Sequence, residues 1–227
     1  MLEIPDISSD YWESPSPSDR GETGSEVLYT AIGEFLSAYE SIENTLAQLF
    51  LIFIGNDFWA SLDVIKSYGT HTSVHKRISD INLASRLYSS TRNIETEPLE
   101  LLLRHVKKAA EVRAVIAHGQ VMQISIGPDN TSWFFTPTWY NSKHQERFDK
   151  EWWSNLPTLS EKDPFAVFGF KFRYTASDIN HYRSLILHIR TQLGFYLSYL
   201  LKEDVLTRTR ATTGSIAPYD EELLKYR

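Results

Sequence analysis

The feature that most constrains the fold is a single apolar stripe that runs through residues 22–54. Apolar side chains recur there at steps of three and four residues, which brings them to one face of a helix. The stripe consists of Leu28, Ile32, Phe35, Tyr39, Ile42, Leu46, Leu49 and Phe53. Because a long helix with one apolar face needs other elements to cover that face, residues 22–54 predict a helical bundle.

Three further segments continue this helical pattern. A short helix is expected at residues 59–68, and a third helix is expected from residue 70–73 to about residue 88. Its inner face would hold Val74, Ile78, Ile81, Ala84 and Leu87. A fourth helix would begin with Pro98 in its first turn and would carry Arg113 on its apolar stripe, and Gly119 is a natural terminator for it.

The period of the pattern changes to two after the fourth helix. Residues 122–126 alternate apolar and polar side chains, a Gly-Pro-Asp-Asn turn follows at 127–130, and residues 133–136 form the returning strand, which predicts a β-hairpin. Residues 168–174 alternate most clearly, and we expect this strand to join the hairpin in a small antiparallel sheet. The Thr-Ala-Ser-Asp sequence at 175–178 resembles a capping box. It predicts the start of a long last helix that ends near residue 206.

The predicted organisation is therefore one mainly α domain with a loose segment at each end. Residues 1–21 are expected to be a disordered acidic tail, residues 22–206 a helical domain with 119–174 as an inserted hairpin and loop, and residues 207–227 a second tail. The net charge of −6, from 23 basic and 29 acidic residues, resides entirely in residues 1–26, which hold seven acids and one Arg. The neutral body is unlike a strongly basic nucleic-acid binder.

Several classes of protein and of site are disfavoured by what the sequence lacks. The chain has no Cys, which excludes a disulfide scaffold and thiolate sites. It has neither a signal-peptide pattern nor an apolar run long enough for a membrane helix, so we expect a cytoplasmic protein with no membrane segment. No phosphate loop or nucleophile elbow is present. His71 and His75 have a spacing found in helical metal sites, but we interpret them as polar residues near a helix start, and we expect no metal and no cofactor.

The strongest chemical signal is Arg113 followed, after four residues, by His118 and then Gly119. Arg113 lies on the apolar stripe of its helix, and burying a guanidinium without a partner is costly, so we expect an acidic or phosphate partner. His118 stands at the helix end, and an imidazole is a group that can donate or accept a proton in catalysis. The same spacing recurs between Arg183 and His188, but that pair lies in the middle of the last helix and no Gly follows it.

The motif resembles the HEPN superfamily, whose hallmark is an Arg followed, after four to six residues, by a His in an antiparallel helical bundle. The Ala-His-Gly ending at residues 117–119 is similar to the ending common in that family. The resemblance covers roughly residues 22–118. It implies a metal-independent endoribonuclease in which His118 moves a proton and Arg113 holds the scissile phosphate, giving a 2′,3′-cyclic phosphate.

The same resemblance implies the partners and the setting. It suggests a homodimer in which both copies of the motif line one cleft, RNA as the substrate, and a toxin or phage-defence context with an antitoxin or other protein partner. Ala114 departs from the family pattern, because many active members have a polar residue directly after the Arg. It favours an alternative, a non-catalytic dimeric module that binds a protein partner or a nucleotide. A third interpretation is structural, with Arg113 bonded to an acid of the first helix and His118 bonded to backbone.

Other charged residues are candidates for supporting roles. Glu40 and Glu43 interrupt a second face of the first helix that is otherwise apolar or small, and either is a candidate partner of Arg113. The candidates for contact with a nucleic-acid backbone are Arg104, Lys107, Lys108, Lys171 and Arg173. Aromatic side chains in the loop at 137–166 are weaker candidates for stacking on bases.

Overall fold

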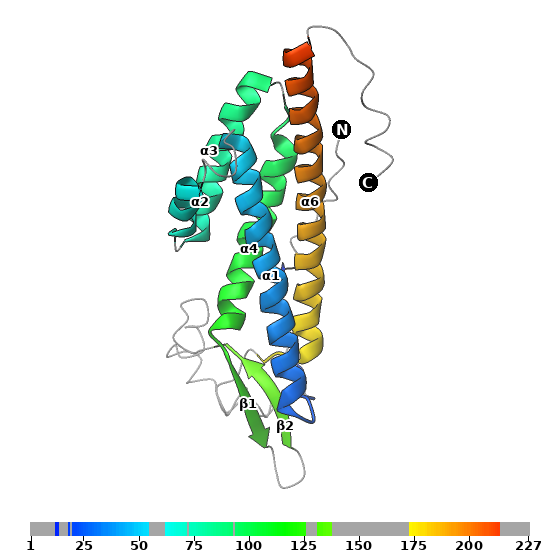
Figure 1. The fold of residues 1–227 in the computed structure, drawn as a ribbon. Helices are drawn as coiled ribbons and strands as arrows, with labels where there is room; N and C mark the ends of the chain where they lie inside the picture. Colours follow the sequence, from blue (N-terminus) through cyan, green and yellow to red (C-terminus); the bar gives the residue numbers. More distant parts are fainter. Residues whose placement is uncertain are drawn as a thin grey trace.

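The computed structural model describes residues 12–13, 18, 20–54, 62–71, 73–92, 94–125, 131–137 and 173–213. These residues form five helices and a two-stranded antiparallel sheet (Figure 1). The elements are α1 (Ser25–Ile54), α2 (Leu62–Gly69), α3 (Val74–Arg92), α4 (Glu97–Ala117), β1 (Gln120–Ser125), β2 (Thr131–Thr136) and α6 (Ala176–Thr213). The predicted class, mainly α with a small antiparallel sheet, is confirmed.

Three long helices, α1, α4 and α6, form an elongated bundle with the hairpin at one end (Figure 1). Helices α1 and α6 run in the same direction, away from the hairpin, and α4 runs back towards it. Helix α3 packs against α1 and α4 in the half of the bundle that lies away from the hairpin, with the short α2 beside it. This arrangement gives α1 neighbours on two sides, α3 and α4 on one and α6 on the other.

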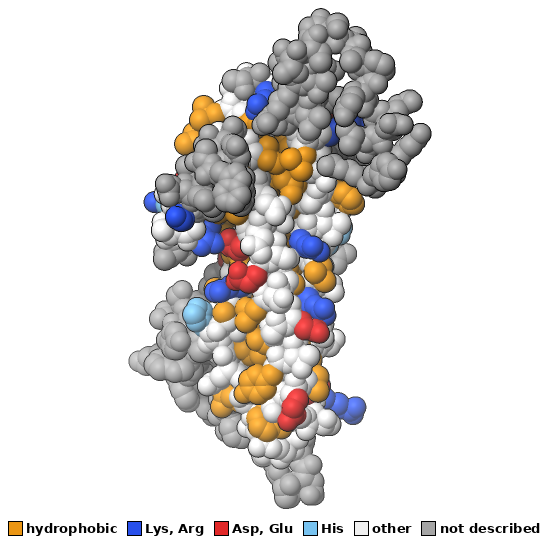
Figure 2. All heavy atoms as spheres, in the orientation of Figure 1, with side chains coloured by type: hydrophobic (Ala, Val, Ile, Leu, Met, Phe, Trp, Pro, Cys, Tyr) orange, Lys and Arg blue, Asp and Glu red, His pale blue; other side chains and the backbone are white. Residues whose placement is uncertain are grey.

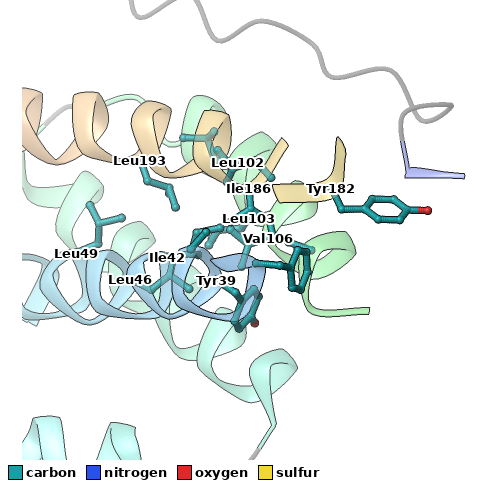
Figure 3. Close-up of a cluster of buried hydrophobic side chains, with 14 of the residues drawn as sticks. Tyr39, Ile42, Leu46, Leu49, Leu102, Leu103, Val106, Tyr182, Ile186 and Leu193 are labelled. Carbon is teal, nitrogen blue, oxygen red and sulfur yellow. The ribbon is translucent and has the colours of Figure 1, made fainter. Parts of the chain in front are cut away.

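The core lies between the three long helices (Figure 3). It includes Ile42, Leu46 and Leu49 from α1, Leu102, Leu103 and Val106 from α4, and Ile186 and Leu193 from α6. Full burial of side chains of this kind contributes about 1.5–3 kcal/mol each. The predicted stripe of α1 is confirmed, because all its members are buried except Ile32, which is half-buried and packs against the same core.

The inner face of α3 differs from the prediction at one position. Leu87 is 64% exposed, whereas Tyr88 and Ser85 are buried. Tyr88 follows the buried Ile81 by seven residues, about two helical turns, so it returns to the same face. Leu87 lies about 120° away from that face, which explains why an apolar side chain points to solvent.

The predicted hairpin is confirmed, with Gln120 opposite Thr136 and Ser125 opposite Thr131. Its turn at 126–130 lies outside the described residues. The other edge of β2 is covered by two isolated bridges, one between Trp133 and Glu22 and one between Phe135 and Tyr174. Covering an edge in this way removes unpaired backbone groups that would otherwise promote aggregation. Of the predicted third strand, residues 168–172 lie outside the described part of the chain.

The two bridges also fix the starts of α1 and α6, because Glu22 and Tyr174 lie just before these helices. The side chain of Glu22 accepts a hydrogen bond from the backbone N–H of Ala176 at 2.9 Å. The predicted capping box is confirmed: the Thr175 N–H donates to Asp178 Oδ2 at 2.7 Å, and the Asp178 N–H donates to Thr175 Oγ1 at 3.3 Å. These bonds satisfy N–H groups that the first turn of a helix leaves free.

Both predicted tails differ from expectation where they are described. The Tyr182 hydroxyl donates to the carbonyl oxygen of Glu13 at 2.8 Å, and Trp12 packs against the core. Part of the N-terminal segment therefore lies against the bundle. At the other end, α6 continues to Thr213, beyond the expected end near residue 206. The remaining residues of both segments lie outside the described ranges.

Gly119 has a different role from the one predicted. Its φ is outside the left-handed region, so it is not a left-handed helix terminator. A Cβ at this position would lie 2.5 Å from Cε2 of Phe135 and 2.7 Å from the carbonyl oxygen of Thr136. A glycine is required here because the chain entering the hairpin passes directly against β2.

Candidate functional site

Arg113 faces a pocket of about 330 Å³ between α1, α3 and α4. The pocket is lined by Tyr39, Glu40, Glu43, Val74, Arg77, Ala110, Arg113 and Ala114. The small side chains of Ala110 and Ala114, on the same side of α4 as Arg113, leave the space open. The structure thus brings Arg113 together with both acids that the sequence singled out.

Glu43 forms an ion pair with a different arginine, Arg77. Its Oε2 lies 2.5 Å from Nη1 of Arg77, and its Oε1 accepts a hydrogen bond from the Tyr39 hydroxyl at 3.0 Å. The Nε of Arg77 donates to the carbonyl oxygen of His71 at 2.9 Å. These bonds tie α3 to α1. Neither Glu40 nor Glu43 forms an ion pair with Arg113 in this structure.

Arg77 is the site residue that sequence analysis missed. It stands next to Ile78, on the border of the apolar stripe of α3, and its side chain is 22% exposed. The sequence feature that could have identified Arg77 is a basic residue near the start of a helix, at the edge of the face that points into the bundle. Its partner could not be identified from spacing, because Glu43 is 34 residues away in the sequence.

The guanidinium of Arg113 has an aromatic neighbour but no carboxylate partner among the described residues. Its Cζ lies 6.0 Å from the centre of the Tyr39 ring, near the limit of a cation–π contact. Burial and then the charge of Glu43 raise the pKa of Tyr39, and the charges of Arg113 and Arg77 oppose this shift. Tyr39 therefore stays a neutral hydroxyl near the guanidinium, whose donors remain available to an anion.

His118 lies outside this pocket. It is the first residue after α4, with φ −110° and ψ 6°, and its side chain is exposed. Five residues at about 100° and 1.5 Å each place it about 140° around the helix from Arg113 and about 7.5 Å further along. Within one chain, Arg113 and His118 therefore face different sides of α4.

The three basic candidates on α4 share the side of His118 rather than that of Arg113. Arg104, Lys107 and Lys108 are all exposed. Lys107 precedes His118 by eleven residues, about three full turns, so the two lie on one face. Lys108 pairs with Glu111 at 3.6 Å. Both partners of this pair are accessible to water, and an ion pair of this kind contributes little to stability.

Arg173 is not a surface residue, which corrects its assignment as a nucleic-acid contact. Its side chain is 2% exposed, its Nε donates to the carbonyl oxygen of Ser18 at 2.7 Å, and its Cζ lies 6.0 Å from the Phe134 ring centre. Its guanidinium therefore acts as a donor within the fold, to the backbone of Ser18. Lys171 lies outside the described residues, as does the aromatic loop.

No cluster of metal-ligating side chains is found in the part of the chain that the structure describes. His71 instead contacts Asp80, with 2.9 Å between Nε2 and Oδ2. Among the described helices, none combines the length and hydrophobicity needed to cross a membrane. Comparison of the chain with protein-family models, curated proteins and solved structures finds no match. The site must therefore be interpreted from its own geometry.

Proposed function

We propose that the protein is a metal-independent endoribonuclease of HEPN type, with Arg113 as the phosphate clamp and His118 as the general acid or base. The observation that carries the proposal is the Arg113 guanidinium, which faces an open pocket of about 330 Å³ and has no carboxylate partner among the described side chains. A half-buried cation with unused donors favours an anionic ligand, and a phosphodiester matches its planar array of N–H groups.

Cleavage requires that the attacking 2′-hydroxyl lose a proton and that the leaving 5′-oxygen gain one. The 2′-hydroxyl of a ribose loses its proton as its oxygen attacks the adjacent phosphorus, and the bond from phosphorus to the 5′-oxygen breaks. The products are a 2′,3′-cyclic phosphate and a 5′-hydroxyl. His118 would transfer one of these protons. Arg113 would stabilise the negative charge that develops on the phosphate oxygens.

The homodimer and the protein partners belong to this proposal. Because Arg113 and His118 face different sides of α4 within one chain, joint action on one phosphate is easier to arrange with a second copy or with a substrate that wraps α4. A toxin or phage-defence setting and an antitoxin partner rest on the resemblance of the motif alone. The proposed cytoplasmic location rests instead on the lack of a signal-peptide pattern and of a long apolar run in the sequence.

The test is RNA cleavage in EDTA by the purified full-length chain, using single-stranded and structured RNA. His118→Ala should lower the cleavage rate by about 10²–10⁴-fold, as loss of a general acid or base does. Arg113→Gln should lower it by about 10²–10³-fold. The matched control is His188→Ala, which removes an exposed His from the second pair with the same spacing, and it should leave the rate unchanged. Cleavage that survives in the folded His118→Ala protein would contradict the proposal, and so would no cleavage of any RNA by the wild type.

One observation favours the alternative function, a non-catalytic module that binds a protein partner or a nucleotide. His118 does not line the pocket that holds Arg113, and Ala114 occupies its wall. In that case a labelled nucleotide should bind to the wild type and not to Arg113→Gln, with no cleavage and no effect of His118→Ala. Circular dichroism of both variants would confirm that they are folded.

A further inference from the structure

The pocket that holds Arg113 also contains an acidic side chain that the fold does not use. Glu40 lines this pocket, and its side chain is exposed. Among the described residues, Glu40 forms neither an ion pair nor a hydrogen bond. Figure 2 shows acidic and basic side chains next to one another beside α1, about halfway along the bundle. A ligand in the pocket therefore meets a carboxylate as well as the guanidinium of Arg113.

The second acid of the pocket, Glu43, has a structural role that Glu40 lacks. The side chain of Glu43 is only 14% exposed and bonds to both Arg77 and the Tyr39 hydroxyl, which holds α3 against α1. Glu40 follows the buried Tyr39 directly, so it lies about 100° around α1 from it. That rotation moves the side chain from the buried side of the helix to the outer edge of the pocket. Its two carboxylate oxygens are therefore accessible to a ligand.

An exposed carboxylate is unfavourable in a site that binds only the RNA backbone, because it repels a phosphate. It is favourable where the ligand carries hydrogen-bond donors in addition to an anionic group. Each nucleotide of an RNA strand has both, since its phosphate is an anion and its base carries N–H groups. Glu40 and Arg113 together thus match one nucleotide, with the phosphate at Arg113 and the base at Glu40.

We propose that Glu40 binds the base of the nucleotide whose phosphate contacts Arg113, and that this base is guanine, an inference that rests on the proposed ribonuclease function. A carboxylate has two oxygens, and both can only accept hydrogen bonds. Guanine presents two donors side by side on its Watson–Crick edge, N1–H and N2–H, which match these two oxygens. Proteins that recognise RNA sequence bind this edge in unpaired bases.

The other three bases match a carboxylate less well. Adenine places the acceptor N1 beside its N6–H donor, and cytosine places the acceptor N3 beside its N4–H donor. In uracil the single donor, N3–H, lies between two carbonyl oxygens. Each of these bases therefore brings at least one acceptor against a carboxylate oxygen, where no hydrogen bond can form and affinity is lost. Glu40 accordingly favours guanine over all three.

The size of the pocket defines the class of substrate further. Its volume of about 330 Å³ is near the lower end of the range of small-molecule sites, about 300–1,000 Å³, so it suits one nucleotide and not a duplex. In a duplex, moreover, the Watson–Crick edge of guanine is already hydrogen-bonded to cytosine. The expected substrate is therefore RNA with an unpaired guanine next to the phosphodiester that is cleaved.

The first test is a binding measurement that does not depend on cleavage. A deoxydinucleotide has one phosphodiester with a base on each side, and it lacks the 2′-hydroxyl that the proposed reaction requires. In isothermal titration calorimetry of the full chain, dGpdG should bind about tenfold more tightly than dApdA. The hypoxanthine dinucleotide dIpdI lacks only the two N2 amino groups. It should bind about fivefold more weakly than dGpdG, the effect of one lost hydrogen bond.

Three variants assign this preference to residues. Glu40→Gln keeps the shape of the side chain and replaces one acceptor by a donor, which matches adenine, so it should bind dApdA at least as tightly as dGpdG. Arg113→Gln should weaken all dinucleotides to a similar extent, because it removes the phosphate contact. The matched control is Glu34→Gln, the same change at another exposed position of α1, where Glu34 pairs with Arg183. It should leave the preference unchanged.

The inference would be overturned by a wild type that binds dGpdG and dApdA equally or binds neither at about 1 mM. A preference for guanine that persists in Glu40→Gln would also overturn it. Mapping of RNA cleavage separates this inference from the proposed function: the wild type should cut beside unpaired guanine, and Glu40→Gln should lose that preference. Cleavage without a base preference would contradict the inference alone, whereas guanine-selective binding without cleavage would contradict the proposed function alone.

Discussion

Replacement of Gly119 by Ala should destabilise the protein strongly, although it adds a single methyl group. The added carbon would lie 2.5 Å from Cε2 of Phe135 and 2.7 Å from the carbonyl oxygen of Thr136. Non-bonded carbons normally stay about 3.5–4.0 Å apart, so the overlap is about 1 Å. Phe135 is 1% exposed and bridged to Tyr174, so neither its ring nor the adjacent backbone has space to move into.

The expected loss in the free energy of unfolding is about 3 kcal/mol. Insertion of one methylene into a packed core costs about 1–3 kcal/mol, and the upper end applies because one of the two obstacles is backbone. Gly33→Ala is the matched control: it makes the same chemical change where the new Cβ meets nothing within 4 Å. That variant should be neutral or stabilised by up to about 1 kcal/mol, from helix propensity.

The assay is equilibrium unfolding in guanidinium chloride, followed by circular dichroism, for both glycine variants. Gly119→Asn separates the steric explanation from a helix-terminator role. Asn tolerates the left-handed conformation, so it would be accepted at a terminator, but it meets the same obstacles and should cost at least as much as Ala. A difference of less than about 0.5 kcal/mol between Gly119→Ala and Gly33→Ala would refute the reasoning.

Two other perturbations follow from the contacts of the site. Glu43→Gln should cost about 2 kcal/mol of unfolding free energy, because it breaks an ion pair whose side chains are only 22% and 14% exposed and leaves Arg77 half-buried without its anion. Glu100→Gln, which breaks the exposed pair with Arg86, should cost less than about 0.5 kcal/mol in the same denaturation series. The free energy of unfolding should also fall as the pH rises above about 10, where a tyrosine of the unfolded chain ionises. Burial raises the folded-state pKa of four tyrosines above that value, so their contribution is complete below pH 10 and is lost above it, a slope that alkaline denaturation would measure. They are Tyr39, Tyr68, Tyr196 and Tyr199.

The helices could be predicted from the sequence because their apolar stripes are long. In α1 the period is maintained over eight positions, and packing of one face follows from helix geometry alone. Helix α3 shows the limit of this reasoning. It carries Leu83 and Leu87 on its exposed side and Ser85 on its buried side. The burial of these side chains therefore follows their position around the helix and not their hydrophobicity.

The contacts of the site could be predicted only in part. The inward position of Arg113 followed from its place on the stripe of α4. The partner of Glu43 did not, because Arg77 reaches it across two helices, and no periodicity relates residues 34 apart in the chain. Arg173 shows the opposite error. Alternation placed it on the polar side of a strand, but its side chain is buried, bonded to the backbone of Ser18 and close to the ring of Phe134.

Ala114 has two physical interpretations that the geometry of α4 helps to weigh. As a departure from the HEPN pattern, it removes a polar group beside Arg113. In the structure, however, Ala114 and Ala117 are the side chains that lie between Arg113 and His118 around the near side of the helix, at about 100° per residue. Both are partly accessible. Because the side chains of these two alanines are short, an RNA strand bound at the Arg113 pocket can pass over this side of α4 and reach the exposed imidazole of His118. A larger polar side chain at 114 would add a hydrogen-bonding group and would narrow that path. The small residue is therefore compatible with cleavage, provided that the substrate, and not a direct contact between the two side chains, connects Arg113 to His118.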